Sequence, residues 1–562
     1  MLKAKMLGLL LLSMLGLLCF SGIPVMAQVD AKPDLTFDLW VLSWDDISVD
    51  TGAGLKLQME PIGIKFNVIM MDDDPMYEGI YQEPRQFVMY EMSQGYGSVP
   101  DHVWWRLHSD NIIDWGDNHF GLDNATMDAA LNEFLGATPA TAAEKARIVQ
   151  LYAKQNIAYI PLFLSDDTHA IRNEWTNYTL KPGGVFTAFN PETMIFMYDT
   201  GLPGTMLFVM AYPSDIGELN PMFYRSERSH WYDMLVYDTL ISYDENLDPY
   251  PWLAESFNVN AAGTQVNFTI RTGVKWHDGA DLTPSDVNFT MYYYKNAPED
   301  AISWSFMQHI TSTAIDGQTV VINLDEPNVF ALQTLGELYI LPEHIRSGIP
   351  ADDARWDDHT NVTAQTGSGP FKYVVRVPDE YTTLDKFANW WGASNPAVGQ
   401  LPNIDQVRID VIDSQDARIL AMRAGDADSE RYEVFGAYVQ TVLNAPELDL
   451  VTGLTSQWDY LLGFNITTAV SGFPGKGIAD INVRRAMCYA INRQQLINIG
   501  RLGFGTPTNS VIPAEFFPSY YHSDGVFYSY NTTIANAILD AAGYLDIDGD
   551  GVREFPGATL PP

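Results

Sequence analysis

The sequence predicts an α/β protein with more than one domain, and three observations support this prediction. The chain has 562 residues, which is too long for one small hydrophobic core. Apolar residues make up 46% of it and charged residues 18%, a composition typical of globular rather than disordered chains. Segments in which apolar residues alternate, as in strands, are interspersed with segments that have the apolar spacing of amphipathic helices.

The N-terminal segment predicts export. Lysines precede an apolar run over residues 6–20, and Val25 and Ala27 are small residues at the two positions that a signal peptidase reads. We therefore expect a signal peptide over residues 1–27, cleaved after Ala27. An uncleaved anchor is the alternative, because residues 6–27 are about long enough to span a membrane.

The two cysteines add little to this interpretation. Cys19 follows Leu18, which is bulky where a lipoprotein signal needs a small residue, so lipidation is disfavoured. Cleavage after Ala27 leaves only Cys488 in the sequence, and no intrachain disulfide can then form.

Charge and motifs exclude several functional classes. The net charge of −39 disfavours binding to nucleic acid or to an anionic membrane surface. The sequence contains no HExxH motif, no GxSxG elbow and no Walker loop. With 71 acidic residues, pairs of carboxylates arise by chance and do not indicate acid–base catalysis. We expect neither an enzymatic activity nor a cofactor.

The segment that precedes residue 199 is predicted to contain a strand, two helices and a second strand. Five apolar residues alternate with strand period: Ile62, Ile64, Phe66, Val68 and Met70. Amphipathic spacing predicts helices over residues 126–135 and 142–156, and a short apolar run predicts a buried strand over residues 159–164. Residues 199–205 combine two glycines and a proline, which predicts a linker.

The second half begins with a strand, a turn and a capped helix. Val266, Phe268 and Ile270 alternate as in a strand, and a turn follows at residues 277–279. Thr283 is then predicted to cap a helix, because proline occupies the first helical position and an aspartate lies three residues after the cap. A last helix is expected over residues 533–544.

Two segments hold clusters of potential metal ligands, but neither predicts a metal site. Residues 101–119 contain three histidines and four aspartates, whose spacing fits neither one helical face nor a hairpin, so a structural or surface role is favoured. Asp546, Asp548 and Asp550 resemble the first half of a calcium loop, although its twelfth position is Gly557 rather than glutamate. An aspartate-rich turn is favoured there, and calcium binding stays open.

The second half carries six motifs that resemble one family when they are taken in order. They lie at residues 219–223, 236–259, 268–290, 366–373, 386–392 and 481–497. Together they closely resemble the family 5 extracellular solute-binding proteins of ABC transporters, a group that includes dipeptide, oligopeptide and nickel binders. Residues 61–68 and 142–164 resemble the same family, but the part that normally comes last.

This order predicts a circularly permuted chain. In the family, an aspartate- and glycine-rich turn runs directly into a strand; here the turn is at residues 543–551 and the strand at residues 35–40. The former termini would be joined through residues 199–205, and an exposed turn is a place where a chain can be cut. A fusion of two half copies is the alternative.

The resemblance implies a fold of two α/β lobes, of the type II periplasmic-binding-protein kind, with an inserted subdomain. The second lobe would consist of residues 35–161 and 456–562, which lie at opposite ends of the chain. The first lobe would consist of residues 162–251, linker included, and 361–455. Residues 252–360 would form the inserted subdomain.

The resemblance also implies a function. The protein would capture a small solute, a peptide or another compound, in the cleft between the lobes and deliver it to an ABC permease. We expect an exported, periplasmic or extracellular monomer that binds no nucleic acid. A secreted hydrolase and a non-transport surface protein on the same fold are the alternatives.

Ligand contacts carried over from the family fall in three places. The residues are Asn220; Tyr96, Ser98 and Asp101 in and after the loop 93–100; and Trp458, Tyr460 and Asn465 on the strand that leads into the second lobe. The two strand aromatics could equally be pocket walls or core residues. No metal ligand is expected among these residues.

The substrate stays open for a physical reason. Peptide-binding members carry an acidic residue in the loop that matches residues 95–101, where it pairs with the α-amino group of the ligand. Here the acid is missing at the expected place, although Asp101 is close. A buried ammonium needs a paired charge, so the sequence does not commit the site to a peptide. Sugars, other small solutes and a metal complex stay open as ligands.

Overall fold

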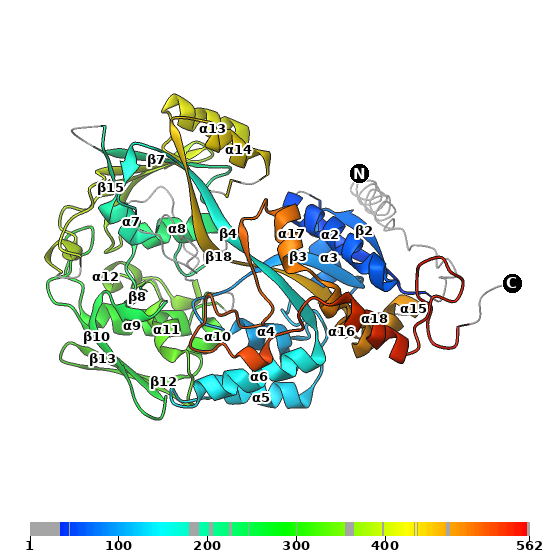
Figure 1. Ribbon diagram of the computed structural model, residues 1–562. Coiled ribbons are helices and arrows are strands. Elements are labelled where there is room, and N and C mark those ends of the chain that lie inside the picture. Colours follow the sequence, from blue (N-terminus) through cyan, green and yellow to red (C-terminus); the bar gives the residue numbers. More distant parts are fainter. Residues whose placement is uncertain are drawn as a thin grey trace, which may run out of the picture.

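Two long antiparallel strands, β4 (Tyr159–Arg172) and β18 (Leu448–Phe464), run through the middle of the molecule and connect its two halves (Figure 1). The computed structural model describes residues 34–558, except 44, 179–189, 202–205, 218, 224–226, 245–246, 299–300, 354–364, 396–397, 432, 435 and 468–471. The predicted signal peptide and most of the predicted linker lie outside the described residues.

β4 and β18 belong to a mixed sheet of 11 strands that extends into both halves. Its order is β14-β15-β16-β7-β17-β4-β18-β3-β1-β2, with β19 paired to β4. The other strands are β1 (Thr36–Leu42), β2 (Lys65–Met71), β3 (Met89–Gly95), β7 (Leu207–Tyr212), β14 (Phe371–Val377), β15 (Tyr381–Lys386), β16 (Gln406–Val411), β17 (Ser429–Glu430) and β19 (Gly505–Pro507). Parallel and antiparallel neighbours alternate irregularly, so the fold is mixed α/β.

The half at the right of Figure 1 has one hydrophobic core, built from both ends of the chain. Blue and cyan elements from residues 35–164 pack there beside orange and red elements from residues 460–555. Its helices are α2 (Asp46–Met59), α3 (Asp73–Tyr81), α4 (His102–Leu107), α5 (Ala125–Leu135), α6 (Ala142–Asn156), α15 (Gly472–Ala479), α16 (Ile481–Ala490), α17 (Arg493–Gly500) and α18 (Thr532–Ala541).

Backbone hydrogen bonds join the two chain ends within this half. The amide of Leu35 donates to the carbonyl of Arg553 at 2.8 Å, and the amide of Arg553 donates to the carbonyl of Gly63 at 2.9 Å. Asp34 and Glu554 form an antiparallel bridge. The strand and the turn that the permuted order brings together are therefore neighbours in space. That this order arose by permutation stays a prediction.

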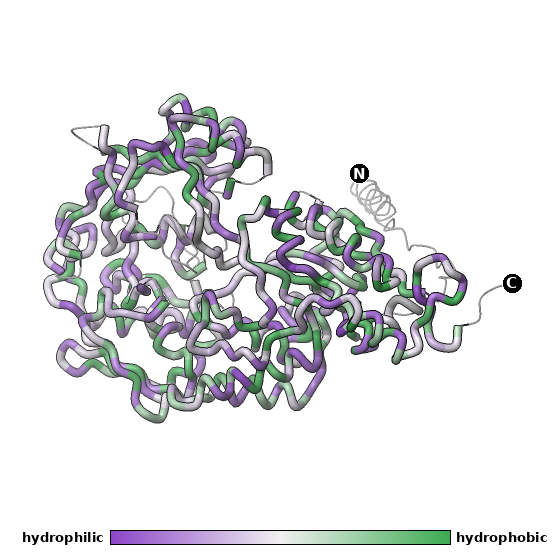
Figure 2. The backbone as a smooth tube through the Cα atoms, in the orientation of Figure 1, coloured by the Kyte–Doolittle hydropathy of each residue, from purple (hydrophilic) through white to green (hydrophobic). Residues whose placement is uncertain are grey.

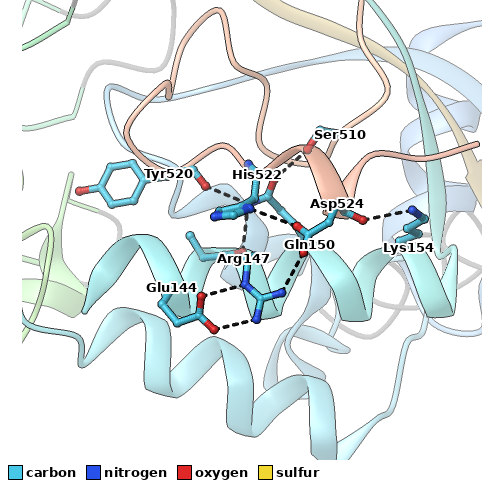
Figure 3. A network of polar contacts seen from close by, with 9 residues as sticks. Glu144, Arg147, Gln150, Lys154, Ser510, Tyr520, His522 and Asp524 are labelled. Atoms are coloured by element: carbon cyan, nitrogen blue, oxygen red, sulfur yellow. Dashed lines mark hydrogen bonds and ion pairs between the residues drawn. The ribbon is translucent and has the colours of Figure 1, made fainter. Parts of the chain in front are cut away.

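A second junction between the chain ends surrounds Gln150, a fully buried residue of α6 (Figure 3). Its amide nitrogen donates to the carbonyl of Tyr520 at 2.8 Å, while its amide oxygen accepts from Ser510 Oγ and from the amide of His522, both at 3.1 Å. At the surface, Arg147 of the same helix pairs with Asp524 at 2.9 Å. α6 thus holds the segment 510–524 in place.

The half at the left contains three further cores. Two of them flank the large sheet, with α7 (Pro191–Phe196), α8 (Glu227–Val236), α13 (Gln415–Ala424) and α14 (Ala437–Leu443). The third surrounds a separate sheet of order β10-β11-β13-β12. Its elements are β10 (Ala254–Val259), β11 (Gln265–Ile270), α9 (Pro284–Lys295), α10 (Trp304–Met307), β12 (Ile310–Asp316), β13 (Thr319–Leu324), α11 (Ala331–Gly336) and α12 (Glu343–Arg346). Apolar stretches are distributed through both halves (Figure 2).

Most of the expected elements are confirmed, and two needed correction. α6 has the predicted bounds, and Thr283 caps α9 in a capping box with Asp286. The strand expected to start at Ile62 starts at Lys65 instead, because Ile62 ends a short 3₁₀ helix and Gly63 follows with φ 74°. The last helix, α18, ends at Ala541, before the residue 544 that was expected. Every helix within the described ranges is too short or too polar to cross a bilayer.

Candidate functional site

A pocket of about 410 Å³ lies where β3 and α4 meet the crossing strand β18. Its aromatic lining comes from Tyr77 and Tyr81 of α3, Trp105 of α4 and Trp458 of β18. The two tryptophans are each 37% exposed, although large apolar side chains are usually buried. Aromatic surface left open beside a pocket is typical of a ligand site.

The local sequence explains why Trp458 faces the pocket. β18 pairs antiparallel with β3, and Trp458 stands opposite Gly95 in this register. A Cβ atom on Gly95 would come within 3.4 Å of the Trp458 ring, so the indole lies over bare backbone. β3 then ends at Gly95, and the loop that follows leads into α4, which supplies Trp105 and Arg106.

Arg106 is the cation of the pocket, and its charge is already paired. Its Nη1 and Nη2 donate to the two carboxylate oxygens of Asp459 at 3.1 and 3.2 Å, and Nη2 also donates to the carbonyl of Gly95 at 3.1 Å. Both side chains are buried. Burial by itself would lower the pKa of Arg106, but Asp459 outweighs it and holds that pKa above its ordinary value. The pair is a permanent, internally neutral part of the wall.

Asp101 and His102 each present a hydrogen-bond acceptor in the pocket wall. Burial raises the pKa of Asp101 to about 6, against the opposing hydrogen bond from Trp105 Nε1 at 3.3 Å. Burial, together with the nearby Arg106, lowers the pKa of His102 well below its ordinary value, so its ring is neutral. Its Nε2 donates to the carbonyl of Val511 at 2.7 Å, which leaves Nδ1 as an acceptor.

Of the seven residues predicted to bind ligand, Trp458 and Asp101 line this pocket. Tyr96 is buried next to it: its ring centroid lies 4.5 Å from that of His102, and the Arg106 guanidinium lies 5.3 Å above the ring. Ser98 lies in the loop between β3 and α4 and hydrogen-bonds to Glu337 in the opposite half of the molecule.

The other three predicted residues make structural contacts away from the pocket lining. Tyr460 is buried and its ring stacks on that of Phe163, with 4.8 Å between the ring centroids. Of the two roles expected for this side chain, it therefore has the role in core packing. The Asn465 amide donates to the carbonyl of Phe87 at 3.1 Å and its oxygen accepts from Thr467. Asn220 is buried and accepts from the amide of Met222 at 3.2 Å.

Residues 101–119 contribute more to the pocket than their sequence indicated. Asp101, His102, Trp105, Arg106 and Asp117 all line it. Apart from Asp101, the sequence favoured a structural or surface role for these residues over a metal site, and the histidines have separate partners in the structure. His108 and His119, for example, hydrogen-bond to Asn132 and to Tyr90. A tryptophan pair next to an arginine, directly after the family's ligand loop, was the signal that could have identified this wall.

Two groups of side chains within the described part of the chain are close enough to hold a metal ion. One is Asp546, Asp548 and Asp550 with Glu554, the buried member that the sequence interpretation missed. The other is His309 with Asp325 and Glu326. Both lie outside the pocket, and the first three aspartates accept hydrogen bonds from amides of their own loop, as in an aspartate-rich turn.

The contact between Ser98 and Glu337 gives a pH-dependence prediction. Burial raises the pKa of Glu337 from 4.5 to about 7, and hydrogen bonds from Ser98 and Tyr243 oppose this shift. Because the folded state binds the proton more tightly, the stabilisation from Glu337 is complete below pH 4.5 and is lost as the pH rises through about 7. Asp101 is the charged neighbour that adds to the shift.

We therefore expect Glu337→Gln to flatten the fall in unfolding free energy between pH 4.5 and about 7. Urea unfolding at several pH values measures this slope. Glu60→Gln, which alters an exposed carboxylate, is the control and should keep the slope of the unsubstituted protein. An identical slope in both variants would contradict the assignment.

Comparison with known proteins identifies relatives of this chain. Residues 248–561, more than half of it, match the family described as bacterial extracellular solute-binding proteins, family 5 Middle. The oligopeptide-binding protein AppA of Bacillus subtilis is 27% identical over 350 residues, which are 61% of this chain and 61% of AppA. The glutathione-binding protein GsiB of Salmonella choleraesuis is 24% identical over 342 residues, 60% of this chain and 62% of GsiB.

A solved structure supports the fold. The ABC transporter substrate-binding protein CtaP of Listeria monocytogenes superposes with a TM-score of 0.50 at 18% identity, over 61% of this chain and 66% of CtaP. The chain spans less than two thirds of the length of the curated relatives named above.

Proposed function

Because the chain belongs to the bacterial extracellular solute-binding proteins of family 5, we propose that it is a transport receptor, which captures a small solute in the pocket beside β18 and delivers it to an ABC permease. One observation carries the proposal: an open, aromatic-walled pocket lies on the strand that connects the two halves of the molecule. A ligand bound there can bias the relative position of the halves.

The family also supports the compartment. Its members are extracellular solute-binding proteins, not enzymes, and we propose that this protein is exported and works as a monomer outside the membrane. A peptide is the ligand named for AppA and glutathione the one named for GsiB. The proposal for this chain is a small solute of peptide size or below, in a pocket of about 410 Å³.

A secreted hydrolase is the enzymatic alternative to the receptor. It requires a nucleophile beside a base in the pocket. Ser93 lines the pocket, and His102 is the only histidine among the lining residues. No hydrogen bond joins the two among the described residues, and the Nε2 proton of His102 is committed to Val511. Turnover of any bound solute would favour this alternative over the receptor.

A pair of substitutions tests whether the pocket is the binding site. Trp458→Ala removes an open pocket wall, so we expect it to weaken solute binding while the free energy of unfolding changes by about 1 kcal/mol or less. Tyr460→Ala removes a buried, stacked ring two residues away, and we expect it to cost about 3–5 kcal/mol of stability.

Titration calorimetry with a solute that stabilises the protein, combined with urea unfolding, separates the two effects. If Trp458→Ala leaves the dissociation constant unchanged, the solute binds elsewhere and the site assignment is wrong. If both variants lose binding and stability in parallel, Trp458 acts in packing instead.

A further inference from the structure

Two buried side-chain atoms of the lining residues lack a partner among the described residues, and both are hydrogen-bond acceptors. His102 is 5% exposed, and its Nδ1 has no partner among the described residues, although the ring is neutral and this nitrogen carries a lone pair. The Oε1 atom of Gln94, a second lining residue, is buried and also lacks a partner within the described ranges. Its Nε2 is oriented toward Tyr81 Oη at 3.5 Å. A buried acceptor without a donor is costly, so both atoms favour a ligand that brings N–H or O–H groups.

The charges of the pocket point to a cationic ligand. Two carboxylates line it, those of Asp101 and Asp117. Asp117 is exposed and accepts no hydrogen bond from any described residue, while Asp101 accepts one from Trp105. Arg106 cannot neutralise them without breaking its bidentate pair with Asp459. Two negative charges beside a paired arginine leave the site net negative, and a desolvated carboxylate gains most from a positive ligand.

The walls fit the same class of ligand. The ring faces of tryptophan and tyrosine attract cations that approach within about 6 Å. Four such rings line the pocket: Tyr77, Tyr81, Trp105 and Trp458. Both tryptophans are partly exposed, so part of their aromatic surface is open to a ligand.

We propose that the pocket selects an organic cation that carries N–H donors, a protonated amine or a guanidinium, over zwitterionic and uncharged solutes. This inference rests on the proposed function, because it names the substrate class of the same site. A zwitterion would bring a carboxylate toward Asp101 and Asp117, where the one lining cation is already paired. A quaternary ammonium would satisfy the charges but leave His102 Nδ1 and Gln94 Oε1 without donors.

Titration calorimetry on the full-length protein with four probes tests the inference. Agmatine carries charge and N–H donors; arginine adds a carboxylate to the same skeleton; hexamethonium carries charge without N–H donors; butanediol is uncharged. We expect agmatine to bind at least about tenfold more tightly than arginine or hexamethonium, and butanediol not to bind. Equal affinity for agmatine and arginine would contradict the charge argument, and equal affinity for agmatine and hexamethonium would contradict the donor argument.

Substitutions locate the effect. Asp101→Asn and Asp117→Asn should each weaken agmatine binding by about tenfold, the second without any risk to folding because Asp117 is exposed. Asp123→Asn, an exposed aspartate of the same region outside the pocket, is the matched control and should bind agmatine as the unsubstituted protein does. Unchanged binding in both pocket variants would overturn the proposal.

A mixture of oligopeptides is tested beside the four probes. It distinguishes a failure of the cation inference from a failure of the proposed binding site. If peptides bind in a manner that depends on Trp458 but agmatine does not bind, the receptor proposal stands and the cation inference is wrong. If agmatine binding is indifferent to Trp458→Ala, the site itself is misassigned.

Discussion

Replacing Asp459 by asparagine is expected to lower the free energy of unfolding by about 3–5 kcal/mol. The substitution keeps the shape of the side chain but removes the charge that neutralises Arg106, and both residues are buried. The Arg106 guanidinium would then be an uncompensated charge in the wall of the pocket, where its other contacts are the carbonyl of Gly95 and the faces of Tyr96 and Tyr159.

Urea unfolding followed by tryptophan fluorescence measures this loss. Glu133→Gln is the control, because its ion pair with Lys145 is solvent-exposed and should contribute about 0–1 kcal/mol. A loss of similar size in the two variants would mean that water reaches Arg106 in solution, and that its charge is available to a ligand after all. The same result would weaken the cation inference.

Replacing Gln150 by leucine should cost about 3 kcal/mol, because it removes the partner of one buried and two partly buried hydrogen-bonding groups at once. These are the hydroxyl of Ser510, the carbonyl of Tyr520 and the amide of His522 (Figure 3). We expect hydrogen exchange to accelerate in the segment 510–524 and in α6 together. Since these segments lie more than 350 residues apart in the chain, coupled loss of protection indicates that both ends build one core.

Glu144→Gln provides the control in the same network. It removes an exposed ion pair with Arg147 on the same helix, and we expect a change within about 1 kcal/mol and no change in exchange. If Gln150→Leu accelerated exchange in α6 alone, the two ends of the chain would not form a single cooperative unit.

Local patterns predicted most of the secondary structure, and the exceptions have physical causes. The alternation from Ile62 to Met70 was continuous in sequence, yet the backbone changes direction at Gly63, whose positive φ favours glycine. Ile62 stays fully buried as the end of a 3₁₀ turn, so burial alone could not distinguish the turn from a strand. The capping box at Thr283 was predictable because all its members are close in sequence.

The site could be predicted in part. The motif order indicated the loop after β3 and the strand that carries Trp458, and both contribute to the pocket. The ion pair that fixes the pocket wall joins residues 353 positions apart, and no local pattern encodes such a contact. Trp458 and Tyr460 have the same parity along the strand but different environments. Tyr460 lies between Ser93 of β3 and Phe163 of β4, whereas Trp458 lies opposite Gly95, the last residue of β3, and outside the register with β4. Only the folded chain distinguishes the open ring from the buried one.

Ligand-dependent thermal stabilisation tests the receptor proposal most directly. The unsubstituted protein and its Trp458→Ala and Asp101→Asn variants are each heated without ligand and with peptides, oligosaccharides, metal ions or organic amines. We predict that one class, the amines, raises the free energy of unfolding by about 2.7 kcal/mol at a hundredfold excess over its dissociation constant, and that both variants lose most of this gain. Stabilisation that survives both substitutions, or turnover of the bound compound, would contradict the account of this protein as a solute receptor with its site beside β18.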